Sequence, residues 1–221
     1  MKKLWIIPAL LLLIGACEEE SAPQPPDNIE EENYLLTEQE AISITKEISE
    51  ELRNMIIKLG EDNNWSFENP GDYSIAKPSL LSIATEEFAD KELAALVKEY
   101  YCNCDIVMLP SISDHTIRLQ ATEIEENSFK VSGINLGNFV IGLHELKIEM
   151  VQIDNQWKLN NWDIEFLEAT ALDLSTDEVQ QAFPEYKLLE ETTYNGMEIY
   201  KLQSDDHVLG IDKNSGALYD L

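Results

Sequence analysis

The segment LHELKIEMVQIDNQWKLNNWDI (Leu143–Ile164) decides the fold. Its first half alternates apolar and charged residues, with Leu146, Ile148 and Met150 on one side, which is the period of a strand with one buried face. The triplet that follows, Asp154-Asn155-Gln156, consists of turn-forming residues. Apolar residues recur after this turn at Trp157, Leu159, Trp162 and Ile164. The segment therefore predicts a β-hairpin that packs one face against a core.

The same period of two extends toward the N-terminus as far as Pro110. Apolar residues alternate with polar ones at Ile117, Leu119, Ala121, Phe129 and Val131. We therefore expect a long antiparallel meander from Pro110 to about Ile164.

Helices are predicted before the meander. Thr37 and Glu40 form a T-x-x-E capping box, the signature of a helix N-terminus. Apolar residues then recur at spacings of three and four, at Ala41, Ile44, Ile48, Leu52, Met55, Ile56 and Leu59. This spacing predicts a long amphipathic helix that ends at Gly60. A loop over Gly60–Asp72 and two shorter helices, over Ser79–Ala84 and Asp90–Tyr101, should follow.

Helices followed by an antiparallel meander predict an α+β fold, with N-terminal helices packed on one face of a curved antiparallel sheet. The order of Glu38–Leu59, Leu80–Tyr101 and the hairpin Leu143–Asp163 resembles the NTF2-like (cystatin-like) superfamily. The resemblance covers residues 34–168 and implies that they form one domain. Because that superfamily contains isomerases, ligand binders and domains without chemistry, the resemblance implies no particular function.

A smaller unit should follow at residues 169–221. Ser175 and Glu178 form a second capping box above a short helix that Pro184 ends. Strands are predicted at Met197–Gln203, His207–Asp212 and Ala217–Tyr219. These strands are similar to the closing strands of PepSY-like modules, which occur in exported regulatory regions. About 50 residues are few for an independent core, so we expect this appendage to pack on the first domain.

The N-terminus has the order of a secretory signal. Lys2 and Lys3 precede an apolar stretch, Leu4–Ala16, which is too short to span a membrane. Ile14-Gly15-Ala16-Cys17 resembles the lipobox of bacterial lipoproteins, which implies cleavage after residue 16 and attachment of acyl chains such as palmitate to Cys17. The alternative is an ordinary signal peptide with an incidental cysteine. The lipobox predicts a chain that is exported and held by lipid on the outer side of the cell membrane.

Residues 17–33 should form a tether. They are acidic, rich in proline and almost free of apolar side chains, so they cannot bury a core. Fully extended, Glu18 to Asn33 spans about 50 Å. The predicted organisation is thus a signal peptide at 1–16, a lipidated tether at 17–33, and folded domains that stand clear of the lipid.

The charge of the chain limits its partners. The full sequence has a net charge of −28, and removal of Lys2 and Lys3 with the signal peptide makes it −30. Such a surface repels the phosphates of nucleic acids and of anionic lipids, so we expect no nucleic-acid partner. A basic partner and simple solubility of an exported protein are both compatible with this charge.

No catalytic, cofactor-binding or metal-binding motif is present. His115, His144 and His207 lie in neither an H-E-x-x-H nor a G-x-S-x-G sequence. His144 beside Glu145 could form an acid–base pair, or it could be a partly exposed strand residue.

A calcium loop starting at Asp212 would need glycine where Ala217 stands, so a hairpin turn accounts better for that segment.

Cys102-Asn103-Cys104 is the most unusual local feature. Two thiols in an exported protein have a reason to be oxidised. A Cys102–Cys104 disulfide, two buried free thiols, and redox or metal chemistry are the three alternatives.

Two functions follow from these patterns. The first is a non-enzymatic interaction or regulatory module, tethered to the membrane through Cys17, with an unknown protein partner in the cell envelope. The second is a small-ligand binder or enzyme that uses the concavity between helices and sheet. Weak cation association by the acidic surface is a third possibility.

Overall fold

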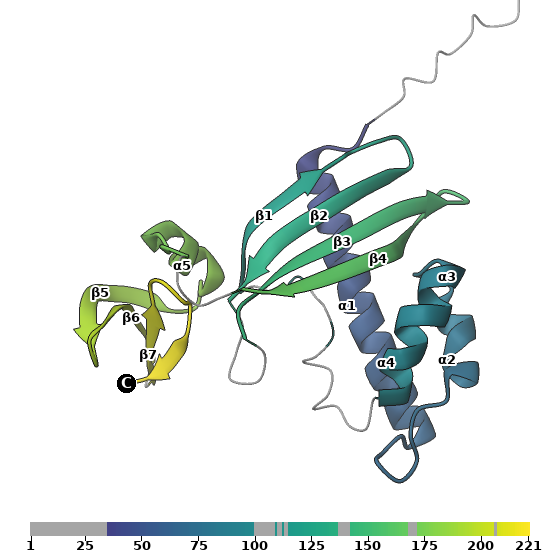
Figure 1. The fold of residues 1–221 in the computed structure, drawn as a ribbon, viewed down its shortest axis with the longest axis horizontal. Helices are drawn as coiled ribbons and strands as arrows, with labels where there is room; N and C mark the ends of the chain where they lie inside the picture. The colour runs from purple at the N-terminus through teal and green to yellow at the C-terminus, as the bar shows by residue number, and fades with distance from the viewer. Residues whose placement is uncertain are drawn as a thin grey trace, which may run out of the picture. The chain divides into compact units, whose positions relative to one another are not determined.

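The structure is a computed structural model that describes residues 35–99, 109, 112, 115–136, 142–167, 172–205 and 207–221. The chain divides into two units, Met1–Asn33 and Tyr34–Leu221. All described residues belong to the second unit. This unit has the expected α+β architecture, with two antiparallel four-stranded sheets and helices packed on them (Figure 1).

Helix α1 (Glu38–Asn63) begins where the sequence predicts. The Thr37 hydroxyl accepts the Glu40 N–H at 3.3 Å, and the Glu40 carboxylate accepts the Thr37 N–H at 2.8 Å. The expected end at Gly60 is wrong, because the left-handed residue that ends the helix is Asn64, with φ 54°. Its N–H donates to the carbonyls of Glu61 and Gly60, which satisfies two groups of the last turn.

The helices after α1 start earlier than expected. Helix α2 (Tyr73–Leu80) begins after Asp72, whose carboxylate accepts the Ser74 N–H at 2.8 Å, so the expected helix at 79–84 is wrong. A second helical run joins α3 (Glu86–Phe88), the π-helical turn η1 (Ala89–Leu93) and α4 (Ala94–Glu99). Apolar spacing alone did not reveal these starts, which depend on capping side chains at Asp72 and Thr85.

The first sheet is the predicted meander. It has the order β1-β2-β3-β4, made by β1 (Thr116–Thr122), β2 (Ser128–Asn135), β3 (His144–Ile153) and β4 (Gln156–Phe166). Figure 1 shows α1 crossing one face of this sheet. The core between them contains Leu52, Ile56, Phe129, Leu146, Ile148 and Met150, each at most 1% exposed. Shared burial of alternate residues fixes the strand register.

Two β-bulges alter the expected alternation. In β4 the register shifts so that Glu149 pairs with Asn161 while Met150 pairs with Leu159, which leaves Asn160 as the extra residue. In β1 a shift between Ile117 and Gln120 surrounds a residue with positive φ. Ile117 therefore does not share a face with Leu119 and Ala121, as the simple alternation predicts.

The C-terminal region contains α5 (Thr176–Ala182) and a second sheet of order β5-β6-β7-β8. Its strands are β5 (Lys187–Tyr194), β6 (Met197–Ser204), β7 (His207–Asp212) and β8 (Leu218–Asp220). The Ser175–Glu178 capping box is formed as expected. Strand β5 was not predicted, because it is an edge strand whose residues are mostly exposed and show no alternation.

A second apolar cluster joins this region to the first sheet. It consists of Ile117, Leu136, Leu143, Leu172, Leu174, Val179, Ala182, Phe183, Tyr200, Leu202, Leu209 and Ile211. Ile117 takes part because the bulge in β1 turns it away from the α1 side. Around Ile117, the first sheet is thus covered on both of its faces.

Candidate functional site

We use the term outer face for the side of the first sheet opposite α1. Between Ile117 and Ile134 at one end and Val151 and Ile153 at the other, this face is polar. Two charged rows cross it: Lys130, Glu149 and Asn161 form one row, and Ser132, Lys147 and Asp163 form the next. Strand alternation places these side chains opposite the buried set, because neighbouring residues point to opposite faces.

A hollow of about 370 Å³ lies on the outer face, within the first sheet. It is lined by Thr122, Glu123, Lys130, Val131, Ser132, Lys147, Ile148, Glu149, Asn161 and Asp163. Val131 and Ile148 are each 1% exposed and direct their side chains to the core, so they contribute backbone to the floor. The walls are formed by polar and charged side chains.

The two lysines of the hollow are already paired. Lys130 Nζ lies 2.5 Å from Glu123 Oε2, and Lys147 Nζ lies 2.9 Å from Glu145 Oε2 and 3.6 Å from Glu165 Oε2. Glu123 raises the pKa of Lys130, with smaller contributions from other carboxylates. Glu145 raises the pKa of Lys147 in the same way. Both lysines are therefore charged and compensated.

Two further carboxylates of the hollow, Glu149 and Asp163, form no ion pair with a described residue, although Glu149 stands opposite Lys130 and helps to raise its pKa, and Asp163 stands opposite Lys147. Glu149 accepts a hydrogen bond from Asn160 Nδ2 at 3.0 Å but forms no ion pair with any described residue. Asp163 forms neither a hydrogen bond nor an ion pair within the described part of the chain. The bulge at Asn160 explains the first contact, because it places two consecutive asparagines on the outer face opposite Glu149.

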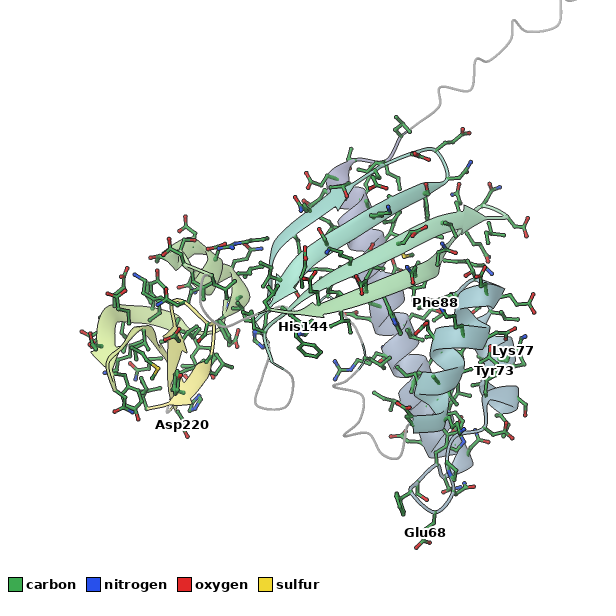
Figure 2. All side chains as sticks on the ribbon, in the orientation of Figure 1. Glu68, Tyr73, Lys77, Phe88, His144 and Asp220 are labelled. Atoms are coloured by element: carbon green, nitrogen blue, oxygen red, sulfur yellow. The ribbon has the colours of Figure 1, made fainter. Side chains whose placement is uncertain are left out.

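His144 and Glu145 do not form the acid–base pair considered from the sequence. His144 is only 5% exposed, and its Nδ1 lies 2.8 Å from the Gly142 carbonyl oxygen (Figure 2). Glu145 instead pairs with Lys147 on the outer face. Adjacent strand residues point in opposite directions, which separates the two groups. The expectation of a partly exposed His144 is likewise wrong.

The other two histidines make contacts between elements. His115 Nδ1 lies 2.8 Å from the Ala182 carbonyl oxygen, and its ring stacks on Phe183 with centroids 4.5 Å apart. His207 lies between the Tyr186 hydroxyl, at 2.9 Å, and Asp220 Oδ1, at 3.2 Å. Because His207 and Asp220 are largely exposed, this pair resembles a surface contact rather than a catalytic relay.

The segment that starts at Asp212 is a hairpin turn, as expected. The Asp212 carboxylate accepts N–H groups from Asn214 at 2.9 Å and Ser215 at 2.7 Å, and Gly216 adopts φ +67°. These bonds all go to Asp212 Oδ1, which is therefore used by the turn itself. Across the described ranges, no three His, Cys, Asp or Glu side chains lie close enough together to hold a metal ion.

Sequence reasoning missed one polar cluster on the helices. The Tyr73 hydroxyl donates to Asp90 Oδ1 at 2.6 Å, and Lys77 Nζ lies 2.7 Å from the same atom (Figure 2). Partial burial, followed by the hydrogen bond to Asp90, raises the pKa of Tyr73 to about 12. The cluster joins α2 to η1 and leaves no group free for chemistry. Nothing in the spacing of these residues along the sequence reveals it.

The signal peptide, the tether and the candidate residues Cys17, Cys102 and Cys104 lie outside the described residues. None of the described helices combines the length and apolar character needed to cross a membrane. A scan against protein-family models, a search of curated proteins and a search of solved structures each gave no significant match.

Proposed function

We propose that this protein is an exported lipoprotein, anchored to the outer side of the cell membrane through acyl chains on Cys17, that acts as a non-enzymatic interaction or regulatory module. The observation that carries the proposal is the N-terminal order of Lys2 and Lys3, an apolar stretch, Gly15-Ala16 and Cys17. The acidic, proline-rich tether after Cys17 supports it, because such a segment holds a folded body away from lipid.

The proposed domains are an NTF2-like domain at residues 34–168 and a PepSY-like appendage at 169–221. The long α1, the short helices after it and the meander that they cover support the first assignment. The short helix and closing hairpins support the second.

Metabolic labelling with an alkyne analogue of palmitate tests the anchor. We expect the full-length protein to be labelled and to sediment with membranes, and Cys17→Ser to be unlabelled and released. A Cys102→Ser variant is the matched control and should be labelled like the wild type. Labelling that persists in Cys17→Ser would show that the acyl group is attached elsewhere.

In-cell cross-linking followed by affinity capture tests the interaction role. A specific envelope protein should be captured with the anchored form and lost with Cys17→Ser, because only the anchored form is held beside its partner. If no protein is enriched over the Cys17→Ser control, the interaction role is wrong.

Small-ligand binding is the second candidate. One observation favours it, the presence of a hollow with convergent polar groups. However, the hollow lies on the outer face, whereas Leu52, Ile56, Phe129 and Met150 fill the space between α1 and the sheet. A thermal-shift screen against metabolites tests it, because ligand binding to the native state raises apparent stability. The interaction role predicts no response to neutral or anionic metabolites.

A further inference from the structure

The outer face is divided into a covered and an uncovered part. Around Ile117 and Ile134 it is apolar and belongs to the second cluster, together with Leu172 and residues of α5. Around Lys130 and Lys147 it is polar, and among the described residues the hollow there is lined by those of the first sheet and its β1–β2 turn. The chain thus covers the outer face where it is apolar, and its polar part is suited to a partner with polar or charged groups.

The charge of the polar part is unbalanced. Lys130 and Lys147 are paired with Glu123 and with Glu145 and Glu165, as described above. Glu149 and Asp163 remain, on neighbouring strands. In the register, Glu149 pairs with Asn161, two residues from Asp163, so these carboxylates are diagonal neighbours with Cα atoms about 7–8 Å apart. A single cationic group that enters between them can contact both.

The chemistry of the hollow distinguishes among cationic ligands. No described group of three potential ligands could hold a metal ion, which disfavours a divalent cation. The volume of about 370 Å³ accommodates a whole side chain, and Ser132 and Asn161 provide neutral hydrogen-bonding groups beside the carboxylates. A planar guanidinium has five N–H donors arranged as a fork and can bind carboxylates on two sides. A lysine ammonium, by contrast, presents its three donors from a single nitrogen atom and lacks this fork.

We propose that the hollow on the outer face is a docking site for an arginine side chain on an exposed segment of a basic partner protein. The inference rests on the proposed interaction function and names the chemistry of its partner. The overall charge, −28 for the full sequence and −30 once Lys2 and Lys3 are removed with the signal peptide, adds attraction at long range, which accelerates encounter with a basic surface. Glu149 and Asp163 then provide the local contact that selects the docking position.

Fluorescence anisotropy with a defined probe tests this site. The probe is a short, fluorescein-labelled peptide of alternating arginine and serine, and its control has citrulline in place of arginine. The protein is the full chain in neutral detergent at physiological salt. We expect the arginine peptide to bind and the citrulline peptide not to bind, because citrulline keeps the shape of the side chain but not its charge.

Paired variants separate the hollow from the general acidity of the molecule. The double variant Glu149→Gln and Asp163→Asn should weaken binding of the arginine peptide at least about tenfold, as expected for loss of charged hydrogen bonds. Glu47→Gln with Glu50→Gln removes the same charge from exposed positions of α1 and should change binding less than about twofold. Asp163→Lys, which places an ammonium in the hollow, should abolish binding. Thermal unfolding checks that each variant is folded.

Three outcomes would contradict the arginine site. The two double variants could weaken binding equally, the citrulline peptide could bind as well as the arginine peptide, or the arginine peptide could fail to bind the wild type. If any of these occurs while palmitate labelling and the cross-linked partner persist, the arginine site is wrong and the interaction function stands. Loss of the labelling and of the cross-linked partner contradicts the proposed function instead.

Discussion

At the scale of single residues, Arg118 connects the first sheet to the C-terminal region. Its Nε donates to Glu178 Oε1 at 2.5 Å, and its Nη2 donates to the Leu172 carbonyl oxygen at 2.8 Å. Arg118 has φ 53° within the β1 bulge. Positive φ is uncommon for a residue with a Cβ, so the contacts of the side chain stabilise a strained backbone position.

Replacement of Arg118 should lower the stability of the protein. We expect Arg118→Ala to reduce the free energy of unfolding by about 1–3 kcal/mol, because it removes two charge-assisted hydrogen bonds and leaves the Leu172 carbonyl and Glu178 Oε1 without this donor. Urea unfolding followed by circular dichroism measures this change. Arg53→Ala, at an exposed position of α1, is the control and should have an effect within about 0.5 kcal/mol. Equal effects of the two variants would mean that the Arg118 contacts contribute nothing.

Glu178 should make stability depend on pH in the acidic range. The hydrogen bond from Arg118 is the main cause that lowers the pKa of Glu178 from 4.5 to about 2. Because the folded pKa is the lower one, the stabilisation is complete above pH 4.5 and is lost as pH falls toward 2. The amount is about 1–2 kcal/mol after allowance for solvent screening. Glu178→Gln should flatten the unfolding free energy over this range, and an unchanged pH profile would contradict the assignment.

The site shows what residue patterns can and cannot reveal. Strand alternation was sufficient to place Lys130, Ser132, Lys147 and Glu149 on one face. It could not select Glu149 and Asp163 among 43 acidic residues. These two stand out because the nearby lysines form their ion pairs with other carboxylates: Lys130 pairs with Glu123, and Lys147 pairs with Glu145. That information lies in side-chain distances, which are not encoded by spacing along the chain.

At the scale of elements, the β4 bulge was not predicted, although the sequence contains a signal for it. Apolar residues occupy odd positions at Trp157 and Leu159 and even positions at Trp162 and Ile164. This change of phase requires one extra residue, which the structure places at Asn160. The β1 bulge gives no such signal, because Ile117 keeps the phase of Leu119 and packs in the other cluster. Strand β5 lacked a signal for a related reason, since most of its residues are exposed at an edge.

Gly133 lies opposite the β1 bulge and should not tolerate a side chain. A Cβ at Gly133 would approach Leu119 Cδ2 and Thr116 Cγ2 to 2.8 Å and the Ile117 carbonyl oxygen to 3.3 Å. We expect Gly133→Ala to lower the free energy of unfolding by about 1–3 kcal/mol through overpacking. Gly142→Ala is the matched control, because a Cβ there meets nothing within 4 Å. If chemical denaturation gives the same midpoint for both variants, the bulge can relax and the packing argument is wrong.

At the scale of the whole molecule, the tether that the sequence predicts before the folded residues has a mechanical consequence. If residues 18–33 serve only as a tether, they contribute reach and not stability. Their composition supports this, because an acidic, proline-rich segment has few side chains that could add to either apolar cluster. Stability and partner access should therefore respond independently to changes in this segment.

Deletion of residues 21–33, with Cys17 to Glu20 retained, tests this independence. We expect the thermal unfolding midpoint to stay unchanged and palmitate labelling to persist, because the folded residues and the lipobox are intact. Capture of the envelope partner should fall sharply, since most of a reach of about 50 Å is lost and the folded body is brought against the lipid. Replacement of residues 21–33 by a glycine–serine linker of the same length should restore capture. If the linker restores nothing, the acidic residues of the segment contact the partner themselves and the segment is more than a tether.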